Sequence, residues 1–493
     1  MIPKKVVVIG SGFSSISTAT YLANNNFEVT ILEKNETPGG RARSFTESGF
    51  TFDMGPSWYW MPDVFENYFK AFGKHPSDYY QLIRLDPSYT VIFNENNFME
   101  VPANFEKLKV LFDSLEPGSS KKLSKFLDQA EYKYQVGMND LVYKPGRLLS
   151  EYLSFKLLLD LFRLDVLQSF HSHVRKFFQH PQLLQLIEFP ILFLGALPKN
   201  TPALYSLMNY ADMQLGTWYP MGGMYKIVEA MVELAKSKGV NFVFNQEVKE
   251  IKTSGNKATH VLTIDNEYPA DIVVAGADYN HVEEDLIESR NRSYSKNYWA
   301  TRVMAPSSLI FYLGINKRLK NLTHHNLFFD QDFISHAEEI YEKPSWPTNP
   351  LFYVSAPSVT DPGVAPEGYE NLFILIPVAP GLKDSLETRE KYFEIIINRF
   401  EKMTRQGIRE NIVYKKSYAH TDFINDYHAF KGNAYGLANT LMQTAILKPS
   451  LKSKKIKNLY FTGQLTVPGP GVPPTLISGK VVSSEIIKDF NPM

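Results

Sequence analysis

The sequence contains no cysteine among its 493 residues. Disulfides, thiol nucleophiles, thiolate zinc sites and iron–sulfur clusters are therefore excluded. The formal net charge is zero, with 52 basic and 52 acidic side chains. No overall field would attract nucleic acid, so we expect neither a nucleic-acid partner nor a metal ion. Any redox chemistry must come from a bound organic cofactor.

Long apolar runs are also missing. No stretch approaches the roughly eighteen consecutive apolar residues that a membrane-spanning helix needs. The longest are "FPILFLGALP" (189–198) and "LFILIPVAPGL" (372–382), which we interpret as buried core segments. The N-terminus "MIPKKVVVIG" does not resemble a signal peptide, so a cytoplasmic location is expected. The chain is too long for one core, and two or three domains are expected.

What is present begins with a β-α-β pattern in the first 33 residues. "KVVVIG" (5–10) is a β-branched run typical of a strand buried on both faces, and "FEVTILE" (27–33) predicts a second strand. The small residues of 13–26 between them have helical spacing. This context makes a glycine-rich turn specific for a dinucleotide.

The turn itself, "VIGSGFSSIS" (8–17), departs from the usual G-x-G-x-x-G. Gly10 permits the tight turn, and Gly12 lets the backbone approach a pyrophosphate at the helix N-terminus. Ser15 stands where the third glycine is expected and is small enough to keep the helix close to the strand. The hydroxyls of Ser14 and Ser15 are expected either to cap free N–H groups or to contact phosphate.

Glu33 ends the second strand, 23 residues after Gly10. An acid at this place binds the ribose hydroxyls of a dinucleotide. It favours a free 2′-hydroxyl, and therefore FAD or NAD over NADP.

The residues that follow resemble the flavin-containing amine oxidase superfamily. "GGR" (39–41) and "FDMGPSWY" (52–59) match its signatures, and the resemblance implies that both segments run beside FAD. It also implies that the backbone at Val248 meets the adenine. The predicted FAD-binding residues are Gly10, Gly12, Phe13, Ser14, Ser15, Glu33, Lys34, Gly39, Gly40, Arg41, Gly55, Pro56, Ser57, Trp58, Val248, Gly463, Gln464, Gly471 and Val472.

The C-terminal segment "NLYFTGQLTVPGPGVPPTLISGK" (458–480) narrows the resemblance. It looks like the C-terminal signature of the bacterial-type carotenoid (phytoene) desaturase family. "GTWYPMGGMYKIVEAM" (216–231) and 422–449 have counterparts in the same order. The resemblance implies an FAD-dependent carotenoid desaturase with a long apolar tunnel. It favours the hydroxycarotenoid or γ-carotene 3,4-desaturase branch over stepwise phytoene desaturation, and the exact bond stays open.

The expected fold class is α/β, with a discontinuous Rossmann-like FAD-binding domain and inserted substrate-binding and helical domains. The expected divisions are FAD-binding parts at 1–90, 216–290 and 446–493, a helical substrate or lid region at 91–215, and a substrate-binding domain at 291–445.

The sequence does not identify a catalytic base. The histidines considered are His171, His173, His180, His324, His325 and His428, and none is assigned. No second dinucleotide motif is present, so oxygen or a quinone is expected to accept the electrons. The alternatives left open are a carotenoid isomerase, a polyamine or monoamine oxidase, and a non-catalytic prenyl or lipid-binding escort.

A carotenoid substrate resides in the bilayer, so peripheral attachment to the inner face of a membrane is expected. The candidate surface is the region 150–198, with Lys156, Arg163, Arg175 and Lys176 meeting lipid headgroups.

Overall fold

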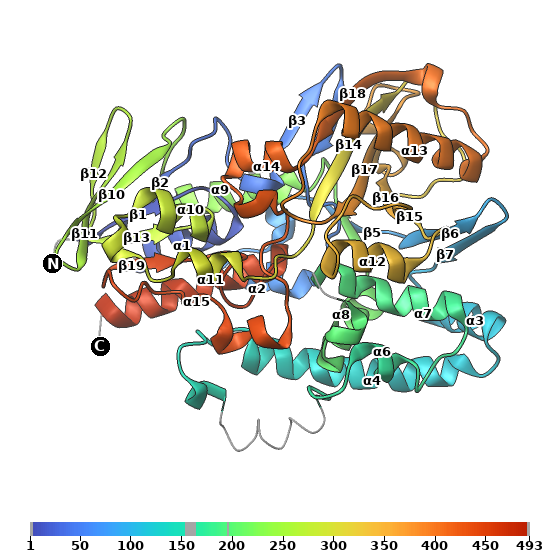
Figure 1. The fold of residues 1–493 in the computed structure, drawn as a ribbon, viewed down its shortest axis with the longest axis horizontal. Coiled ribbons are helices and arrows are strands. Elements are labelled where there is room, and N and C mark those ends of the chain that lie inside the picture. Colours follow the sequence, from blue (N-terminus) through green and yellow to red (C-terminus); the bar gives the residue numbers. More distant parts are fainter. Residues whose placement is uncertain (1–2, 153–163, 195–196, 491–493) are drawn as a thin grey trace.

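A computed structural model describes residues 3–152, 164–194 and 197–490. Two sheets organise these residues, one in each half of the molecule (Figure 1). The half that holds both chain termini is built on a parallel sheet, and the other half on a larger mixed sheet.

The parallel sheet has the order β19-β13-β1-β2-β9. Its strands are β1 (Lys5–Ile9), β2 (Glu28–Leu32), β9 (Asn241–Val243), β13 (Ile272–Ala275) and β19 (Leu459–Phe461). They come from three distant parts of the chain, and each pair is parallel. The expected fold class, a discontinuous Rossmann-like domain, is confirmed by this sheet. The β-branched run of β1 is buried because other elements of this half of the molecule cover both faces of the parallel sheet.

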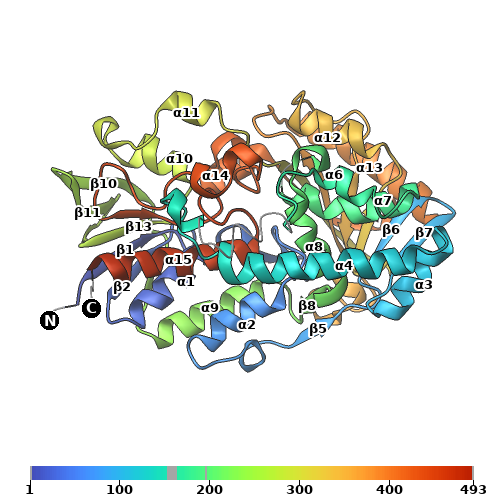
Figure 2. The same ribbon diagram turned by 90° about the horizontal axis from the view of Figure 1, so that it is seen from below.

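Helices α1 (Phe13–Ala23) and α15 (Val472–Phe490) lie side by side under this sheet (Figure 2). Their approach depends on small residues. A Cβ on Gly479 would come within 2.5 Å of the Ser17 Cβ and 2.6 Å of the Ser14 carbonyl oxygen. The Ser17 hydroxyl donates to the Leu476 carbonyl at 2.9 Å. The two ends of the chain are therefore packed directly on each other.

The remaining elements of this half surround the sheet. They are α2 (Pro62–Lys70), α9 (Tyr225–Ser237), α10 (Tyr279–His281), α11 (Lys296–Ala300) and an antiparallel sheet of β10 (Val248–Ser254), β11 (Lys257–Thr263) and β12 (Glu267–Pro269). The segment 241–254 is divided between the two sheets of this half, as β9 and β10.

The second sheet has seven strands in the order β18-β14-β17-β16-β15-β6-β7. They are β6 (Tyr89–Asn94), β7 (Asn97–Val101), β14 (Ser307–Ile315), β15 (His325–Phe328), β16 (Phe352–Ser355), β17 (Glu370–Val378) and β18 (Ile412–Tyr418). Helices α12 (Phe333–Tyr341), α13 (Leu386–Thr404) and α14 (His420–Tyr427) accompany it. Two small two-stranded sheets complete the strands: the hairpin of β3 (Ser44–Glu47) with β4 (Phe50–Asp53), and the antiparallel pair of β5 (Leu82–Arg84) with the distant β8 (Trp218–Pro220).

A helical layer lies below the second sheet in Figure 1. It contains α3 (Phe105–Leu115), α4 (Ser119–Val136), α6 (Phe170–Val174), α7 (Pro181–Glu188) and α8 (Leu207–Tyr210). The layer falls within 91–215, the division expected to be helical, whereas β6 and β7, at the start of that division, belong to the large sheet.

The surface expected to meet a membrane is partly core. Lys156 and Arg163 lie outside the described residues, and Arg175 is paired with Glu188 at 2.5 Å. Phe189 and Ile191, from the apolar run 189–198, are buried. Among the helices of the described residues, none combines the length and apolar character needed to cross a bilayer.

Candidate cofactor and substrate site

The glycine-rich turn lies at the carboxyl end of β1. Gly10 has φ +86°, a conformation that favours glycine, and its N–H donates to the Leu32 carbonyl at 2.8 Å. Gly12 precedes α1, and a Cβ placed on it would meet no atom within 4 Å. The N–H groups of the first turn of α1 therefore face open space, as a bound phosphate requires.

Ser15 of α1 is accommodated by Gly276, a glycine that directly follows β13. Its side chain is 0% exposed, and its hydroxyl oxygen lies 1.8 Å from where a Cβ on Gly276 would be. The missing third glycine of the turn is thus replaced by a glycine that follows β13. Among the described residues neither Ser14 nor Ser15 forms a side-chain capping bond at the start of α1, so of the two expected alternatives the phosphate contact remains the prediction for the Ser14 hydroxyl. Ser14 lines the cavity described below, whereas Ser15 packs behind it.

Glu33 is buried at the end of β2, with 4% of its surface exposed. One carboxylate oxygen accepts from the Ser11 N–H at 2.8 Å and the Ser11 hydroxyl at 2.6 Å. The other accepts from the Asn35 N–H and side-chain amide, both at 2.9 Å. The two backbone bonds fix the carboxylate, and the two side-chain donors can turn away when ribose hydroxyls replace them.

Arg41 joins the first signature to the C-terminal segments. With its oxygen turned toward Arg41, the Gln464 carboxamide accepts from both terminal guanidinium nitrogens at 3.3 and 3.2 Å. One of these nitrogens also donates to the Asn433 carbonyl at 3.2 Å, and the guanidinium stacks 5.2 Å from the Tyr427 ring centre. Burial lowers the pKa of Arg41, and nearby Asp278 partly offsets this. The Arg41 Nε is buried without a hydrogen-bond partner.

The C-terminal loop closes the same site from the opposite side. The Gly463 N–H donates to the Ser478 hydroxyl at 3.1 Å, and a Cβ on Gly463 would lie 3.2 Å from the Ser14 hydroxyl oxygen. Gly471 and Val472 then begin α15, with its N-terminus directed at the cavity.

Helix α14 and the residue that follows it add three residues to the cavity wall, of which the sequence analysis had considered only His428. Asp426, Tyr427 and His428 line the cavity. Asp426 pairs with Arg43 at 2.7 Å, and the His428 Nε2 lies 3.0 Å from a Glu247 carboxylate oxygen, which accepts the hydrogen bond. Burial lowers the pKa of His428 to about 4. These residues appeared in the sequence only within a family-like segment, which gave no reason to choose them.

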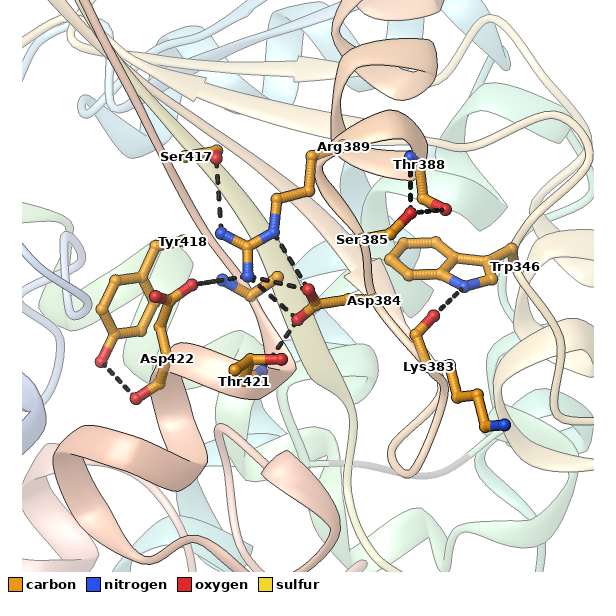
Figure 3. Close-up of polar contacts among 11 residues, drawn as sticks. Trp346, Lys383, Asp384, Ser385, Thr388, Arg389, Ser417, Tyr418, Thr421 and Asp422 are labelled. Atoms are coloured by element: carbon orange, nitrogen blue, oxygen red, sulfur yellow. Dashed lines mark hydrogen bonds and ion pairs between the residues drawn. The ribbon is translucent and has the colours of Figure 1, made fainter.

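A buried ionic network holds the start of α14 (Figure 3). Arg389 of α13 binds both oxygens of Asp384 at 2.9 and 3.0 Å and pairs with Asp422 at 2.8 Å. Asp384 also accepts from the Thr421 N–H at 2.8 Å. Burial raises the pKa of Asp384, but the Thr421 N–H and Arg389 outweigh it, so the pKa is below its usual range.

One cavity of about 380 Å³ connects all these parts, within the range of small-molecule sites. Every predicted FAD-binding residue lines it except Ser15. Beyond the glycine-rich turns its wall is largely apolar, with Trp58, Trp60, Met61, Met208, Ile310, Leu375 and Phe423. The cavity therefore has a nucleotide end rich in backbone donors and an apolar end.

A chain of polar contacts reaches the apolar end from His325, which itself lies behind the cavity wall. His325 stacks on Trp58, with ring centres 4.1 Å apart, and its Nδ1 is 2.6 Å from the Tyr353 hydroxyl. Tyr353 donates to the Ser57 hydroxyl at 3.0 Å. Burial holds the pKa of His325 well below its usual value, so the ring is neutral. Of the other histidines considered, His428 lines the nucleotide end, while His171, His173, His180 and His324 do not line the cavity.

The residues fit FAD. Free helix N–H groups, open space at Gly12, a buried carboxylate at Glu33 and a buried guanidinium nitrogen without a partner at Arg41 match a dinucleotide's pyrophosphate and ribose. The apolar end offers room for a ring system and a hydrocarbon.

Comparison with known proteins agrees with this geometry. The model of the family "Flavin containing amine oxidoreductase" matches residues 14–487. The chain is 40% identical to a carotenoid 3,4-desaturase of Haloarcula japonica over 98% of both chains. It is 31% identical to a zeta-carotene-forming phytoene desaturase of Myxococcus xanthus, covering 98% of this chain and 94% of that one.

Solved structures share the fold at low identity. An oxidoreductase of Methanosarcina mazei superposes with a TM-score of 0.64 at 17% identity, covering 97% of this chain and 100% of the other. A cyclohexylamine oxidase of Brevibacterium oxydans gives a TM-score of 0.60 at 12% identity, covering 99% and 100%.

Proposed function

The chain belongs to the flavin-containing amine oxidoreductases and, among them, to the carotenoid desaturases, and from this premise we propose that it oxidises the 3,4 single bond of a carotenoid end group to a double bond. The observation that carries the proposal is the 40% identity to a carotenoid 3,4-desaturase over 98% of both chains. The phytoene-type desaturases match at 31% and 32%. The amine oxidases share only the fold.

FAD, when bound, supplies the acceptor for the hydride, with its two electrons, that one substrate carbon loses, while the neighbouring carbon loses a proton. The chain supplies the binding site and the position. We assign the phosphates to the N–H groups at Gly12 and the first turn of α1, and the ribose to Glu33. Arg41 is assigned to the pyrophosphate side, where its free Nε gives it an unused donor.

The apolar wall positions a substrate that has no heteroatom near the reacting bond. Trp58, Trp60 and Met61 on one side and Ile310 and Leu375 on the other exclude water and orient the polyene by contact area. Oxygen or a quinone is the proposed final electron acceptor.

The first test is the purified protein's visible absorption spectrum, followed by product analysis. We expect the two absorption bands of oxidised flavin. We then expect a new conjugated double bond in a hydroxylated or γ-carotene-type carotenoid, at a higher rate than in phytoene. A protein that binds no flavin contradicts the cofactor assignment. A flavoprotein that desaturates phytoene and leaves the end-group substrates unchanged contradicts the assigned bond.

We also propose peripheral binding to a membrane, at a different surface from the run 189–198. Leu148, Met442, Ile446 and Leu447 are exposed apolar side chains. Their two segments touch, because a Cβ on Gly146 would lie 3.2 Å from the Ala445 carbonyl oxygen. Such a patch suits the boundary of a bilayer.

Liposome co-sedimentation tests the patch. The variant Leu148→Ser/Met442→Ser/Ile446→Ser should lose binding that survives moderate salt in the wild type. The matched control is Leu386→Ser, another exposed leucine, on α13. Equal binding of both variants contradicts the assigned surface.

A further inference from the structure

Lys448 is a buried amine with no partner. It follows the 3-10 turn Ala445–Leu447, and only 5% of its surface is exposed. Within the described residues its Nζ has no hydrogen-bond acceptor and forms no ion pair. Burial of an ammonium without a partner costs free energy, which indicates that the amine has a role in the protein.

The amine lies against the C-terminal loop. Its Nζ is 3.3 Å from where a Cβ on Gly469 would be, and Gly469 has φ +140°. The Asn439 side-chain oxygen, which is also buried without a donor, lies 3.0 Å from the same point. Glycine at 469 is required both by its conformation and by the space that these two polar groups occupy.

The same loop forms a wall of the cofactor cavity. Pro470, Gly471 and Val472 line the cavity, and α15 begins at Val472. The N-terminus of α15, which is the positive end of its dipole, and the Lys448 amine therefore both lie next to this loop. Both favour negative charge on the cavity side of that loop.

We propose that Lys448 is an electrostatic positioning residue for the redox step, whose amine binds a proton when the cofactor gains negative charge. The inference rests on the proposed function. For each bond oxidised, the substrate gives up a hydride, which carries two electrons and one proton, and a second proton. The cofactor takes the hydride, and one proton from solution or substrate is bound by the amine, so the reduced pair stays neutral overall.

The electrostatic surroundings support a change of protonation at neutral pH. Burial lowers the pKa of Lys448 to about 7 and is its only cause. Neither 437–447 nor 464–471 contains a charged residue. Arg147, which follows Gly146 on the segment that touches Ala445, is paired with Glu485 of α15 at 2.5 Å. Burial raises the pKa of Tyr205, which bonds to Thr444, so that group stays neutral. Negative charge beyond the loop would raise the pKa of Lys448.

The test is the reduction potential of the FAD-loaded protein as a function of pH, without carotenoid. A couple that takes two electrons and one proton falls by about 30 mV per pH unit, and one that takes two protons by about 60 mV. We expect the wild type to change from the shallow to the steep slope above about pH 7, where the amine is uncharged before reduction and charged after it.

Variants separate charge from packing. Lys448→Met should keep the shallow slope throughout, with potentials below the wild type at low pH. Lys448→Arg, which stays charged, should also keep the shallow slope and should match the wild type at low pH. The control is Asp212→Asn, because burial raises the pKa of Asp212 to about 7 as well, and this variant should retain the steep segment.

A wild type with one slope from pH 6 to pH 9 overturns the proposal, whether or not any variant folds. So does a steep segment that persists in Lys448→Met or disappears in Asp212→Asn. Because the potential is measured without substrate, failure to desaturate a carotenoid would count against the proposed function alone.

Discussion

At the scale of single residues, the site depends on pairs that are far apart in the sequence. Ser15 and Gly276 are the clearest pair, since the serine hydroxyl fills the space that a Cβ on Gly276 would need. The serine breaks the usual motif, and the glycine that compensates directly follows β13, far away in the sequence. Motif reading alone could establish that the residue had to be small, but not why serine is tolerated.

The Ser15–Gly276 pair makes a prediction by double substitution. Gly276→Ala should lose FAD, because its Cβ would collide with the Ser15 hydroxyl, and overpacking costs ~1–3 kcal/mol. Ser15→Gly should be tolerated, and Ser15→Gly/Gly276→Ala should recover FAD binding. Ser15→Leu should abolish binding. Flavin content after purification measures each effect, and full flavin in Gly276→Ala would contradict the packing.

Glu33 gives a second residue-scale prediction. Glu33→Ala should weaken FAD binding sharply, because charge-assisted hydrogen bonds contribute ~1.5–3 kcal/mol each. It should also lower the stability of the FAD-free protein, since the N–H groups of Ser11 and Asn35 lose their acceptor. FAD titration and thermal unfolding separate the two effects. Glu28→Ala, an exposed glutamate on the same strand, is the control. An unchanged FAD affinity would rule out the ribose assignment.

At the scale of elements, the position of α14 is fixed by contacts with residues that do not line the cavity. Arg389 of α13 forms an ion pair with the start of α14. The cavity residues Asp426, Tyr427 and His428 come at its other end. Local sequence predicts a short amphipathic helix there but not its direction, because the ion pairs that fix it join residues of α13, α14 and the loop between β17 and α13.

The prediction for α14 is a loss of stability with a defined pH dependence. Arg389→Met leaves Asp384 buried without its partner, which costs ~3–5 kcal/mol. The depressed pKa of Asp384 means that its stabilisation is present above its unfolded pKa and is lost as pH falls through the folded value. The variant should therefore lose part of the wild type's acid sensitivity and bind FAD less tightly. Urea unfolding between pH 3 and pH 7 measures the stability and its pH dependence, and FAD titration measures the affinity.

Arg389→Met/Asp384→Asn serves as the matched control, because the buried charge is then removed with its partner. It should recover part of the stability lost in Arg389→Met. Equal stability of the single and double variants would show that the network does not hold the start of α14.

At the scale of the whole molecule, the cofactor cavity is where distant segments meet. β1, β13 and β19 come from three parts of the chain, and α1 packs on α15 across more than 450 residues of sequence. A ligand that contacts all three parts should stabilise the folded chain as one unit.

We expect FAD at 100 times its dissociation constant to raise the free energy of unfolding by ~2.7 kcal/mol. The transition should stay single, with the C-terminal segment protected from proteases together with the N-terminal one. Calorimetry with and without added FAD, followed by limited proteolysis, measures this. Early release of a C-terminal fragment in the presence of FAD would contradict a site shared by both ends.

The sequence by itself determined the local chemistry. The β-α-β pattern, Glu33, the glycines at 39–40 and the C-terminal loop each contain their signal in a short window, because turns and strand ends have local steric requirements. The same windows contain the predicted cofactor-binding residues, which line the cavity with the exception of Ser15. The catalytic base remained unassigned, since a histidine's surroundings are not visible in its neighbours along the chain.

Only the tertiary structure decided the long-range partners. It placed Gly276 behind Ser15, Tyr427 beside Arg41, and Lys448 behind Gly469. It also showed that Phe189 and Ile191 are core and that the exposed apolar patch includes Met442 and Ile446. Such contacts depend on how distant segments pack, and close packing is decided by shapes that meet in space rather than by periodicity along the chain.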